Sequence, residues 1–336
     1  MFNIYKISVV FITLVLVGSS QIRYAHAQFP GQELDRVFIE LIQQFAGPTK
    51  DFPGPNEPYE AWVRSSAVDV NRASITWTHN GEVVAEGLGV KSYIFRTGDV
   101  GRIETLSITV SANGRVFEDS RTFHINDVDL LWQAFTTVPS WYKGKALTSS
   151  QSAITVTAFP VLLRNGKKLP PAQLVYRWSL DDDFKPESSG SRRRSFSFLA
   201  DFVPGIEQEI TVKVSDINNT LQAQKTIVIP VAQPKVLFYE ERPLEGTVMG
   251  KALTNFILPA GTENTFRAIP YFFTRGAPLS YEWLIDGKPA REEGLPDILR
   301  LTAAAGSRGP VSISTTINNV RNILQRITDS FIINVQ

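Results

Sequence analysis

The sequence predicts an all-β protein made of three tandem β-sandwiches, and three observations lead to that fold class. Apolar and polar residues alternate over short stretches, as in Ile210-Thr211-Val212-Lys213-Val214, which is typical of half-buried strands. Asn-Gly and Asp-Gly pairs, which suit the tight turns of hairpins, separate such stretches. Short sequence segments also recur at intervals of about 100 residues, which indicates repeated structural units.

Length and composition limit the kind of protein. The 336 residues allow two or three domains, each with its own core. Lys and Arg number 34 against 33 Asp and Glu, so the chain lacks the basic excess of proteins that coat nucleic acid. There is no cysteine, which excludes disulfide scaffolds, thiol nucleophiles and zinc–thiolate sites. Each domain must therefore be stable through packing alone.

The first 27 residues have the organisation of a signal peptide. Lys6 precedes an apolar run over residues 7–18, and Ala25-His26-Ala27 is the small-x-small pattern that signal peptidase recognises. The run is shorter than the roughly 20 residues that span a bilayer, although an uncleaved membrane anchor is the alternative. We expect cleavage between Ala27 and Gln28 and an exported bacterial protein, extracellular or in the cell envelope, with no later membrane span.

Residues 28–47 are expected to contain a short amphipathic helix. The apolar residues follow the i, i+3, i+4 spacing of one helix face: Leu34, Val37, Phe38, Leu41, Ile42 and Phe45. Gly47-Pro48 would end the helix. We expect the helix to pack on the first domain, with a partner-binding or membrane-surface helix as the alternative.

Three tryptophans, Trp77, Trp178 and Trp283, mark the repeat. Each lies in an alternating stretch, and Gly144-Lys145-Ala146-Leu147 recurs as Gly250-Lys251-Ala252-Leu253. A unit of this length fits a sandwich of about seven strands, in which the tryptophans are expected to be buried core residues. The three domains are predicted to span residues 48–127, 128–233 and 234–336.

The tryptophan segments resemble those of bacterial Ig-like and PKD-like β-sandwich repeat proteins. The three segments are Trp77-Thr78-His79-Asn80-Gly81, Trp178-Ser179-Leu180-Asp181-Asp182 and Trp283-Leu284-Ile285-Asp286-Gly287. The chain is also similar to uncharacterised exported proteins of candidate-phyla bacteria, in which WYKGKAL-like and AxPYFF-like segments recur. The WxFGDG segment usual in PKD domains is missing, so the Ig-like label fits better. The resemblance covers about residues 60–336 and implies a spacer, an adhesive module or an assembly part.

The reactive residues do not indicate an enzyme. After cleavage only His79, beside a predicted turn, and His124, in a predicted strand, remain, and no GxSxG, HExxH or phosphate-binding loop accompanies them. The acidic pairs Glu240-Glu241 and Glu292-Glu293 are adjacent in sequence, and neighbours on a strand point to opposite faces. A glycosidase needs two converging carboxylates. We expect no catalytic residue and no cofactor.

Asp181, Asp182 and Asp183 are weak candidates for a calcium site. They follow the Trp178 strand, and the corresponding positions of the other units are not acidic clusters. Calcium needs about six to eight oxygen ligands that converge on one point. A solvated loop is therefore expected, and no metal site is predicted.

Trp132, Trp141 and Tyr142 are the candidates for a binding surface, because they cluster in the linker-like segment before Gly144. Aromatic residues hold comparable places in the third unit: Phe238, Tyr239, Tyr271, Phe272 and Phe273. We expect these rings to seal the junction between successive domains. A platform for a carbohydrate or a protein partner is the alternative.

The sequence thus favours a non-catalytic protein of the cell envelope or surface that acts as an adhesion, spacer or assembly module, for instance in a surface appendage. Its partner would be a protein or a glycan, and no nucleic acid. A carbohydrate- or peptidoglycan-binding accessory protein is the second hypothesis, and an envelope enzyme is the third. Rings buried at the junctions would favour the spacer, whereas rings free on one face would favour the glycan binder.

Overall fold

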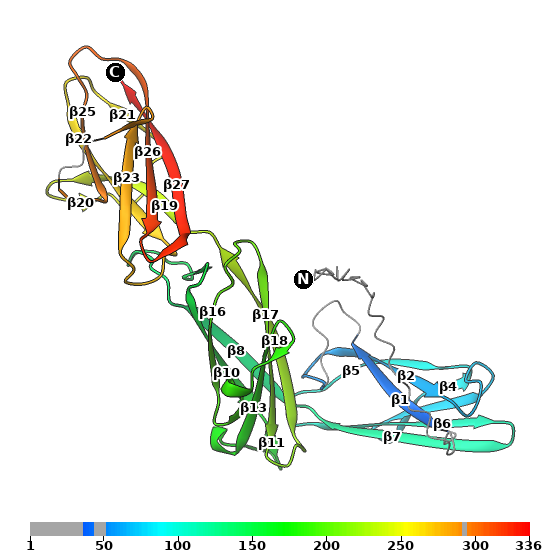
Figure 1. The fold of residues 1–336 in the computed structure, drawn as a ribbon. Helices are drawn as coiled ribbons and strands as arrows, with labels where there is room; N and C mark the ends of the chain where they lie inside the picture. Colours follow the sequence, from blue (N-terminus) through cyan, green and yellow to red (C-terminus); the bar gives the residue numbers. More distant parts are fainter. Residues whose placement is uncertain (1–35, 44–51, 291–293) are drawn as a thin grey trace, which may run out of the picture.

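The computed structural model describes residues 36–43, 52–290 and 294–336. They form three β-sandwiches in a row, of which the second and third continue one another while the first turns away at an angle (Figure 1). No α-helix occurs in this part of the chain, and the predicted Ig-like all-β fold class is confirmed. The predicted signal peptide and its cleavage site lie outside the described residues.

The first sandwich consists of seven strands in two antiparallel sheets. The strands are β1 (Val37–Gln43), β2 (Pro58–Ser65), β3 (Ser74–His79), β4 (Glu82–Leu88), β5 (Ser92–Arg96), β6 (Ile103–Ala112) and β7 (Arg115–His124). One sheet has the order β1-β2-β5 and the other the order β4-β3-β6-β7. Seven strands divided in this way form an Ig-like sandwich.

The predicted helix over residues 28–47 is wrong where the structure describes it, because Val37–Gln43 is strand β1. The spacing of the apolar residues fits a period of two as well as a helical period, with Val37 and Ile39 buried and Phe38 between them exposed. β1 pairs along its whole length with β2. A short helix gains most of its stability from packing, so the hydrogen bonds offered by the edge of β2 decide in favour of the strand.

Side chains of the opposite sheet bond to the backbone of Ile39 at the outer edge of β1. The N–H of Ile39 donates to the Asp119 carboxylate at 2.8 Å, and the Arg121 guanidinium donates to the Ile39 carbonyl at 3.3 Å. Both side chains come from β7. They connect the two sheets and occupy backbone groups that would otherwise form an open sheet edge.

The second sandwich has the same core arrangement with additional short strands. Its strands are β8 (Asp127–Ala134), β9 (Thr148–Ser149), β10 (Ala153–Val161), β11 (Leu163–Arg164), β12 (Lys167–Lys168), β13 (Leu174–Leu180), β14 (Asp183–Phe184), β15 (Gly190–Ser191), β16 (Ser195–Leu199), β17 (Glu207–Asp216) and β18 (Gln222–Ala232). Short 3-10 helices span Pro171–Gln173 and Pro186–Ser188. The sheets have the orders β16-β10-β8 and β14-β13-β17-β18-β9, and β9 runs parallel to β18.

The third sandwich repeats this topology. Its strands are β19 (Lys235–Arg242), β20 (Gly246–Thr247), β21 (Asn255–Leu258), β22 (Glu263–Tyr271), β23 (Leu279–Ile285), β24 (Lys288–Pro289), β25 (Ile298–Thr302), β26 (Gly309–Asn319) and β27 (Asn322–Val335). The sheets have the orders β20-β19-β22-β25 and β21-β27-β26-β23-β24, and β21 runs parallel to β27.

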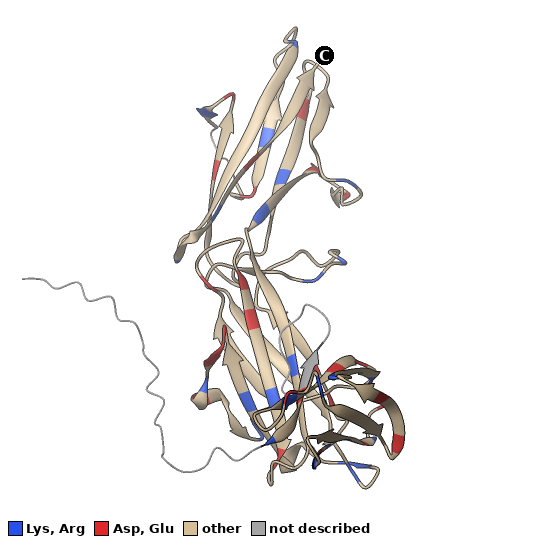
Figure 2. Ribbon diagram, turned by 90° about the vertical axis from the view of Figure 1, so that its right-hand side faces the viewer, with Lys and Arg blue, Asp and Glu red and all other residues tan. Residues whose placement is uncertain are grey.

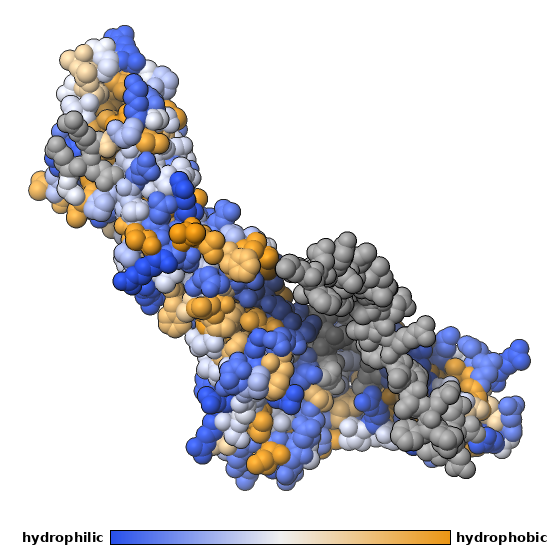
Figure 3. All heavy atoms as spheres, viewed as in Figure 1, coloured by the Kyte–Doolittle hydropathy of each residue, from blue (hydrophilic) through white to orange (hydrophobic). Residues whose placement is uncertain are grey.

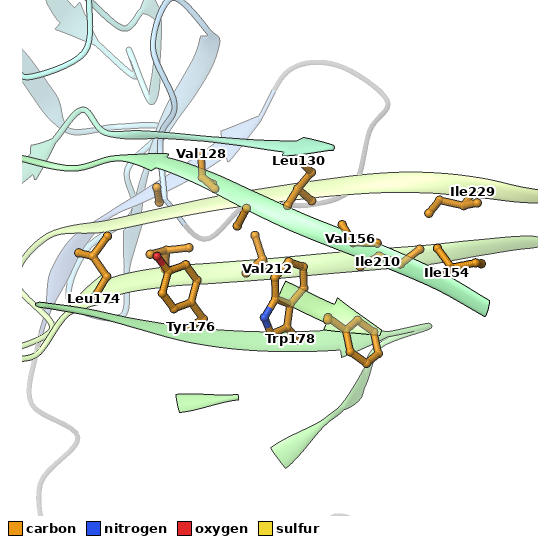
Figure 4. Packing of buried hydrophobic residues seen from close by; sticks show 14 of the residues in the cluster. Val128, Leu130, Ile154, Val156, Leu174, Tyr176, Trp178, Ile210, Val212 and Ile229 are labelled. Carbon is orange, nitrogen blue, oxygen red and sulfur yellow. The ribbon is translucent and has the colours of Figure 1, made fainter. Parts of the chain in front are cut away.

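A tryptophan occupies the same place in each core. Trp77, Trp178 and Trp283 lie on the equivalent strands β3, β13 and β23 and are at most 1% exposed. In the second sandwich, Trp178 and Tyr176 point between the two sheets toward the aliphatic side chains of β10 and β17 (Figure 4). Burying such large rings in the middle of the sandwich supplies much of the apolar area that stabilises each unit.

The Asn-Gly and Asp-Gly pairs form tight turns. Asn80-Gly81 connects β3 with β4, Asn113-Gly114 connects β6 with β7, and Asn165-Gly166 connects β11 with β12. Both residues of each pair have positive φ, and so have Asp286 and Gly287 between β23 and β24. Two-residue hairpins with this geometry match the right-handed twist of the strands, so these turns help to set the strand register.

Candidate functional site

The first and second sandwiches are joined without a linker. Only Ile125 and Asn126 lie between β7 and β8, and they are 0% and 1% exposed. The Asn126 amide nitrogen donates to the Gln222 carbonyl, and its amide oxygen accepts from the Leu163 N–H, both at 3.2 Å. Since both partners belong to the second sandwich, Asn126 fixes the angle at which the chain enters it.

A glycine allows the same two sandwiches to come into close contact. Gly101, between β5 and β6, donates its N–H to the Ile125 carbonyl at 2.7 Å. Its φ is +92°, and a Cβ atom there would lie 2.6 Å from Cδ1 of Leu163 in the second sandwich. The positive φ favours glycine at this position, and any larger residue would also force the end of the Leu163 side chain to shift.

The second and third sandwiches are joined by main-chain hydrogen bonds. The Thr137 N–H donates to the Phe273 carbonyl, and the Phe272 N–H donates to the Thr137 carbonyl, both at 2.7 Å. The Arg275 N–H donates to the Phe135 carbonyl at 3.0 Å. A short piece of antiparallel pairing thus crosses this junction.

Gln325 on β27 is the centre of a buried polar network at the same junction. It is 0% exposed, and its amide nitrogen donates to the Ser149 hydroxyl at 3.0 Å and to the Ser150 carbonyl at 2.8 Å. Its amide oxygen accepts from the Thr274 N–H at 3.0 Å and from the Asn319 amide at 2.8 Å. A buried amide satisfied in this way specifies one relative arrangement of the two sandwiches.

Aromatic rings cover one side of this junction. Trp141 lies edge-on to Tyr239, with ring centroids 6.3 Å apart, and Tyr142 lies edge-on to Tyr271 and Phe272 at 5.5 and 6.0 Å. Trp141 and Tyr142 are half-buried. Burial, together with a hydrogen bond to Tyr239, raises the pKa of the Tyr271 hydroxyl. The candidate rings of the second sandwich thus face rings of the third.

Trp132 lies apart from these rings. It is on β8 and packs against the core of the second sandwich, with the Lys145 ammonium 3.3 Å from its ring centroid. Burial lowers the pKa of Lys145. The structure therefore brings Trp141 and Tyr142 together at the junction and places Trp132 elsewhere.

Asp181, Asp182 and Asp183 occupy the hairpin between β13 and β14. Asp181 and Asp182 have positive φ, the Asp181 carboxylate accepts from the Glu209 N–H at 2.7 Å, and Asp183 forms an ion pair with Lys185 at 2.6 Å. In the described ranges no group of three His, Asp or Glu side chains is arranged to hold a metal ion. The three residues serve as turn and surface residues here.

The histidine in the first sandwich is enclosed. His79 Nε2 lies 3.3 Å from the Glu104 carboxylate, and the two side chains are 14% and 4% exposed. The His79 ring lies edge-on to Phe95 at 5.0 Å, and Glu104 also accepts from the Gly98 N–H at 2.7 Å. This pair is part of the packing at one end of the sandwich.

The acidic pair Glu240-Glu241, which the structure describes, is engaged in ion pairs. Glu240 contacts Arg242 at 3.1 Å, and Glu241 contacts Arg267 at 3.2 Å, so each carboxylate faces an arginine. Glu292-Glu293 lies outside the described residues. His124, at the end of β7, lines a hollow beside the first junction together with Arg121 and Gln222.

Sequence reasoning missed Asn126 and Gln325, the buried amides at the two junctions. Asn126 stands between Ile125 and Asp127, and Gln325 stands between Leu324 and Arg326, and in both places an amide normally indicates a turn or an exposed position. The only available signal was the absence of a Gly-, Pro- or Ser-rich linker before Asp127, which already argues for a direct connection.

No protein-family model and no curated protein matches the chain. Solved structures do match. The three N-terminal domains of the bacteriophage RB49 Highly Immunogenic Outer Capsid protein are 11% identical, with a TM-score of 0.24 over 90% of this chain and 99% of that one. The central fibronectin-III array of RIM-binding protein is 11% identical, with a TM-score of 0.30 over 91% and 98%.

A third match is SGBP-B of the Bacteroides ovatus mixed-linkage glucan utilization locus, solved with a mixed-linkage heptasaccharide. It is 12% identical, with a TM-score of 0.20 over 91% of this chain and 71% of that one. Such low identities and TM-scores carry no argument about function. Among the described residues, no helix has the length and apolarity needed to cross a bilayer.

Proposed function

We propose that the protein is a non-catalytic spacer or assembly module of the bacterial cell envelope or surface, which holds its partners at a fixed distance. Three copies of one scaffold in a row give reach and repeated contact surfaces, whereas a catalytic site needs unlike groups that converge within a few ångströms. Export through the segment that ends at Ala27 is part of this proposal, and N-terminal sequencing of the secreted protein tests it.

The set of direct hydrogen bonds across both junctions carries the proposal. Domains that move independently are usually connected by polar linkers and meet in small hydrated contacts. Here Asn126 and Gln325 are 1% and 0% exposed and bond directly to the neighbouring sandwich. Changing either angle would leave buried polar groups unpaired, at a cost of about 1–3 kcal/mol for each group.

The aromatic rings favour the spacer over the carbohydrate-binding accessory at this position. A ring platform for sugars needs flat faces that are open to solvent, but Trp141 and Tyr142 contact Tyr239, Tyr271 and Phe272 of the third sandwich. Their contacts add apolar area to the polar network around Gln325.

Distance measurements between the outer sandwiches test the proposal. The chain has no cysteine, so Ser120→Cys on β7 and Ser330→Cys on β27, both exposed, would carry unique spin labels. Double electron–electron resonance should give a single narrow distance distribution between them. Gln325→Ala should broaden it, while a control pair inside the third sandwich, Ser280→Cys with Ser330→Cys, stays narrow. A broad distribution in the protein with Gln325 intact would overturn the proposal.

A further inference from the structure

A shallow hollow of about 400 Å³ crosses the junction between the second and third sandwiches. Gln151 contributes to it from the second sandwich. The loop 274–277 and the turn between β26 and β27 contribute from the third. The hollow exists only while the two sandwiches hold their relative position.

Hydrogen bonds within the protein hold the walls of this hollow in place. The Asn322 amide donates to the Ser150 carbonyl at 2.9 Å, and the Gln151 amide donates to the Ala200 carbonyl at 2.9 Å. The walls are therefore ordered before a ligand arrives, which lowers the entropic cost of binding.

The charged groups in the lining have one sign. Arg275 and Arg321 are both exposed, and the described lining contains no carboxylate. Along the rest of the ribbon, acidic and basic residues are mixed (Figure 2). A hollow lined by one sign of charge concentrates ions of the opposite sign, so this one selects an anion.

We propose that the hollow binds a polysaccharide that carries carboxylates, with Arg275 and Arg321 bonded to a uronate group. The guanidinium fork matches the two oxygens of a carboxylate. Gly276 and Ala277 have small side chains, so the space beside the arginines can accept a sugar ring. Thr274 and Gln151 add hydroxyl and amide groups that can bond to sugar hydroxyls.

Exposed aliphatic residues adjoin the lining in sequence. Val320 and Ile323, which flank Arg321 and Asn322, are 64% and 87% exposed, but they do not line the hollow itself. Apolar residues are visible at the neck between these two sandwiches (Figure 3). A sugar chain that extends beyond the hollow can place the C–H face of a further pyranose ring on such apolar surface.

An acidic peptide cannot bind here as an added strand, which is a common binding mode of extended peptides and needs an open sheet edge. The backbone beside the hollow is already paired, because Phe135 and Thr137 bond with Phe272, Phe273 and Arg275. A polysaccharide requires no such edge.

Calorimetric titration of the full chain with oligogalacturonate tests the proposal, with fully methyl-esterified oligogalacturonide as the uncharged control. We expect the acidic form to bind, the binding to weaken as salt rises, and the ester not to bind. Arg275→Gln and Arg321→Gln should each lower the affinity about tenfold, since each removes a charge-assisted hydrogen bond. Both residues are exposed, so unchanged circular dichroism and thermal unfolding should confirm that the variants fold.

Arg326→Gln is the matched control, because it removes one exposed positive charge from β27, outside the lining of the hollow. It should leave the affinity unchanged. No binding of oligogalacturonate, equal binding of the ester, an equal loss in Arg326→Gln, or tighter binding of poly-glutamate would each overturn the proposal. The binding measurements test the polysaccharide site alone. The distance measurements test the rigid spacer alone, because a rigid array of domains can lack a glycan site.

Discussion

The indole nitrogen of Trp178 donates a hydrogen bond to the carbonyl oxygen of Arg193, 2.8 Å away. The other two sandwiches contain the same bond, from Trp77 to Val90 at 2.8 Å and from Trp283 to Pro296 at 3.0 Å. In each case the acceptor lies two residues before the strand that follows, β16, β5 or β25, in the opposite sheet. The tryptophan is therefore a core residue and also a connection between the sheets.

Because of this hydrogen bond, we expect two substitutions of Trp178 to lower the stability of the second sandwich by different amounts. Trp178→Phe should destabilise the second sandwich by about 1–3 kcal/mol, because the Arg193 carbonyl loses its donor. Trp178→Ala should cost about 3–5 kcal/mol, because a cavity is added. Urea unfolding measures both variants. A Phe variant as stable as the original protein would show that the hydrogen bond contributes nothing.

Gly101 offers a test of the first junction. Gly101→Ala should destabilise the contact between the first two sandwiches more than Gly114→Ala destabilises its hairpin. Both glycines have positive φ, +92° at Gly101 and +73° at Gly114, so both variants carry backbone strain of roughly 1–2 kcal/mol. Only at Gly101 does the added Cβ also meet another side chain, that of Leu163, whose displacement should add about 1 kcal/mol. Equal thermal shifts in the two variants would contradict the proposed close contact.

Asp216 predicts how stability depends on pH. Burial opposes its ionisation, but hydrogen bonds from Leu221 and Thr220 and the charge of Arg164 outweigh it, so its pKa lies below the ordinary value. Its contribution is therefore complete above the unfolded pKa of about 4 and is lost as the pH falls through the lower pKa of the folded state. In urea unfolding of the second sandwich, Asp216→Asn should be less stable at neutral pH and lose less stability below about pH 4. Parallel pH profiles would refute this assignment.

The edge of β1 can be tested through a single amide. In Asp119→Ala the Ile39 N–H loses its acceptor, so its hydrogen exchange should accelerate by at least about tenfold, the equivalent of roughly 1.4 kcal/mol. Asp119→Asn keeps an acceptor oxygen and should exchange nearly as slowly as the original protein. Exchange that is equally fast in both variants would mean that the carboxylate charge, and not the hydrogen bond, protects the edge.

The domain boundaries at 127/128 and 233/234 stay a prediction. Residues 128–233 expressed alone should fold, because the buried core cluster of the second sandwich runs from Val128 to Val231 and lies within them. Cooperative urea unfolding of this fragment would support the boundaries, and a non-cooperative transition would oppose them.

The repeated fold could be read from the sequence because its signals are local. A buried tryptophan on one strand and an Asn-Gly turn after a strand are each set by a few neighbouring residues. The helix predicted around Val37 was wrong because the apolar residues there fit both a helical period and the period of two of a strand. The repeat could have decided between helix and strand. The second and third units each begin with a strand, β8 and β19, so the first unit is expected to begin with an equivalent strand.

The junctions could not be read in the same way, because their decisive contacts join distant parts of the chain. Gln325 bonds to Ser150, 175 residues earlier, and Asn126 bonds to Gln222, 96 residues later. A polar side chain gives no sign in the sequence that it is buried until its partners are known. Trp141 and Tyr142 could be recognised as a cluster because they are adjacent in sequence. Their individual ring partners in the third sandwich could not be assigned, because those partners are distant in the chain.

The pairing of the terminal strands determines how each sandwich responds to tension. β21 runs parallel to β27 over four residue pairs, and β9 runs parallel to β18 over two. When the ends of such a unit are pulled apart, the parallel strands must slide past each other, so their hydrogen bonds bear the load together. Because β9 contributes two such pairs and β21 contributes four, the second sandwich is expected to open under load before the third.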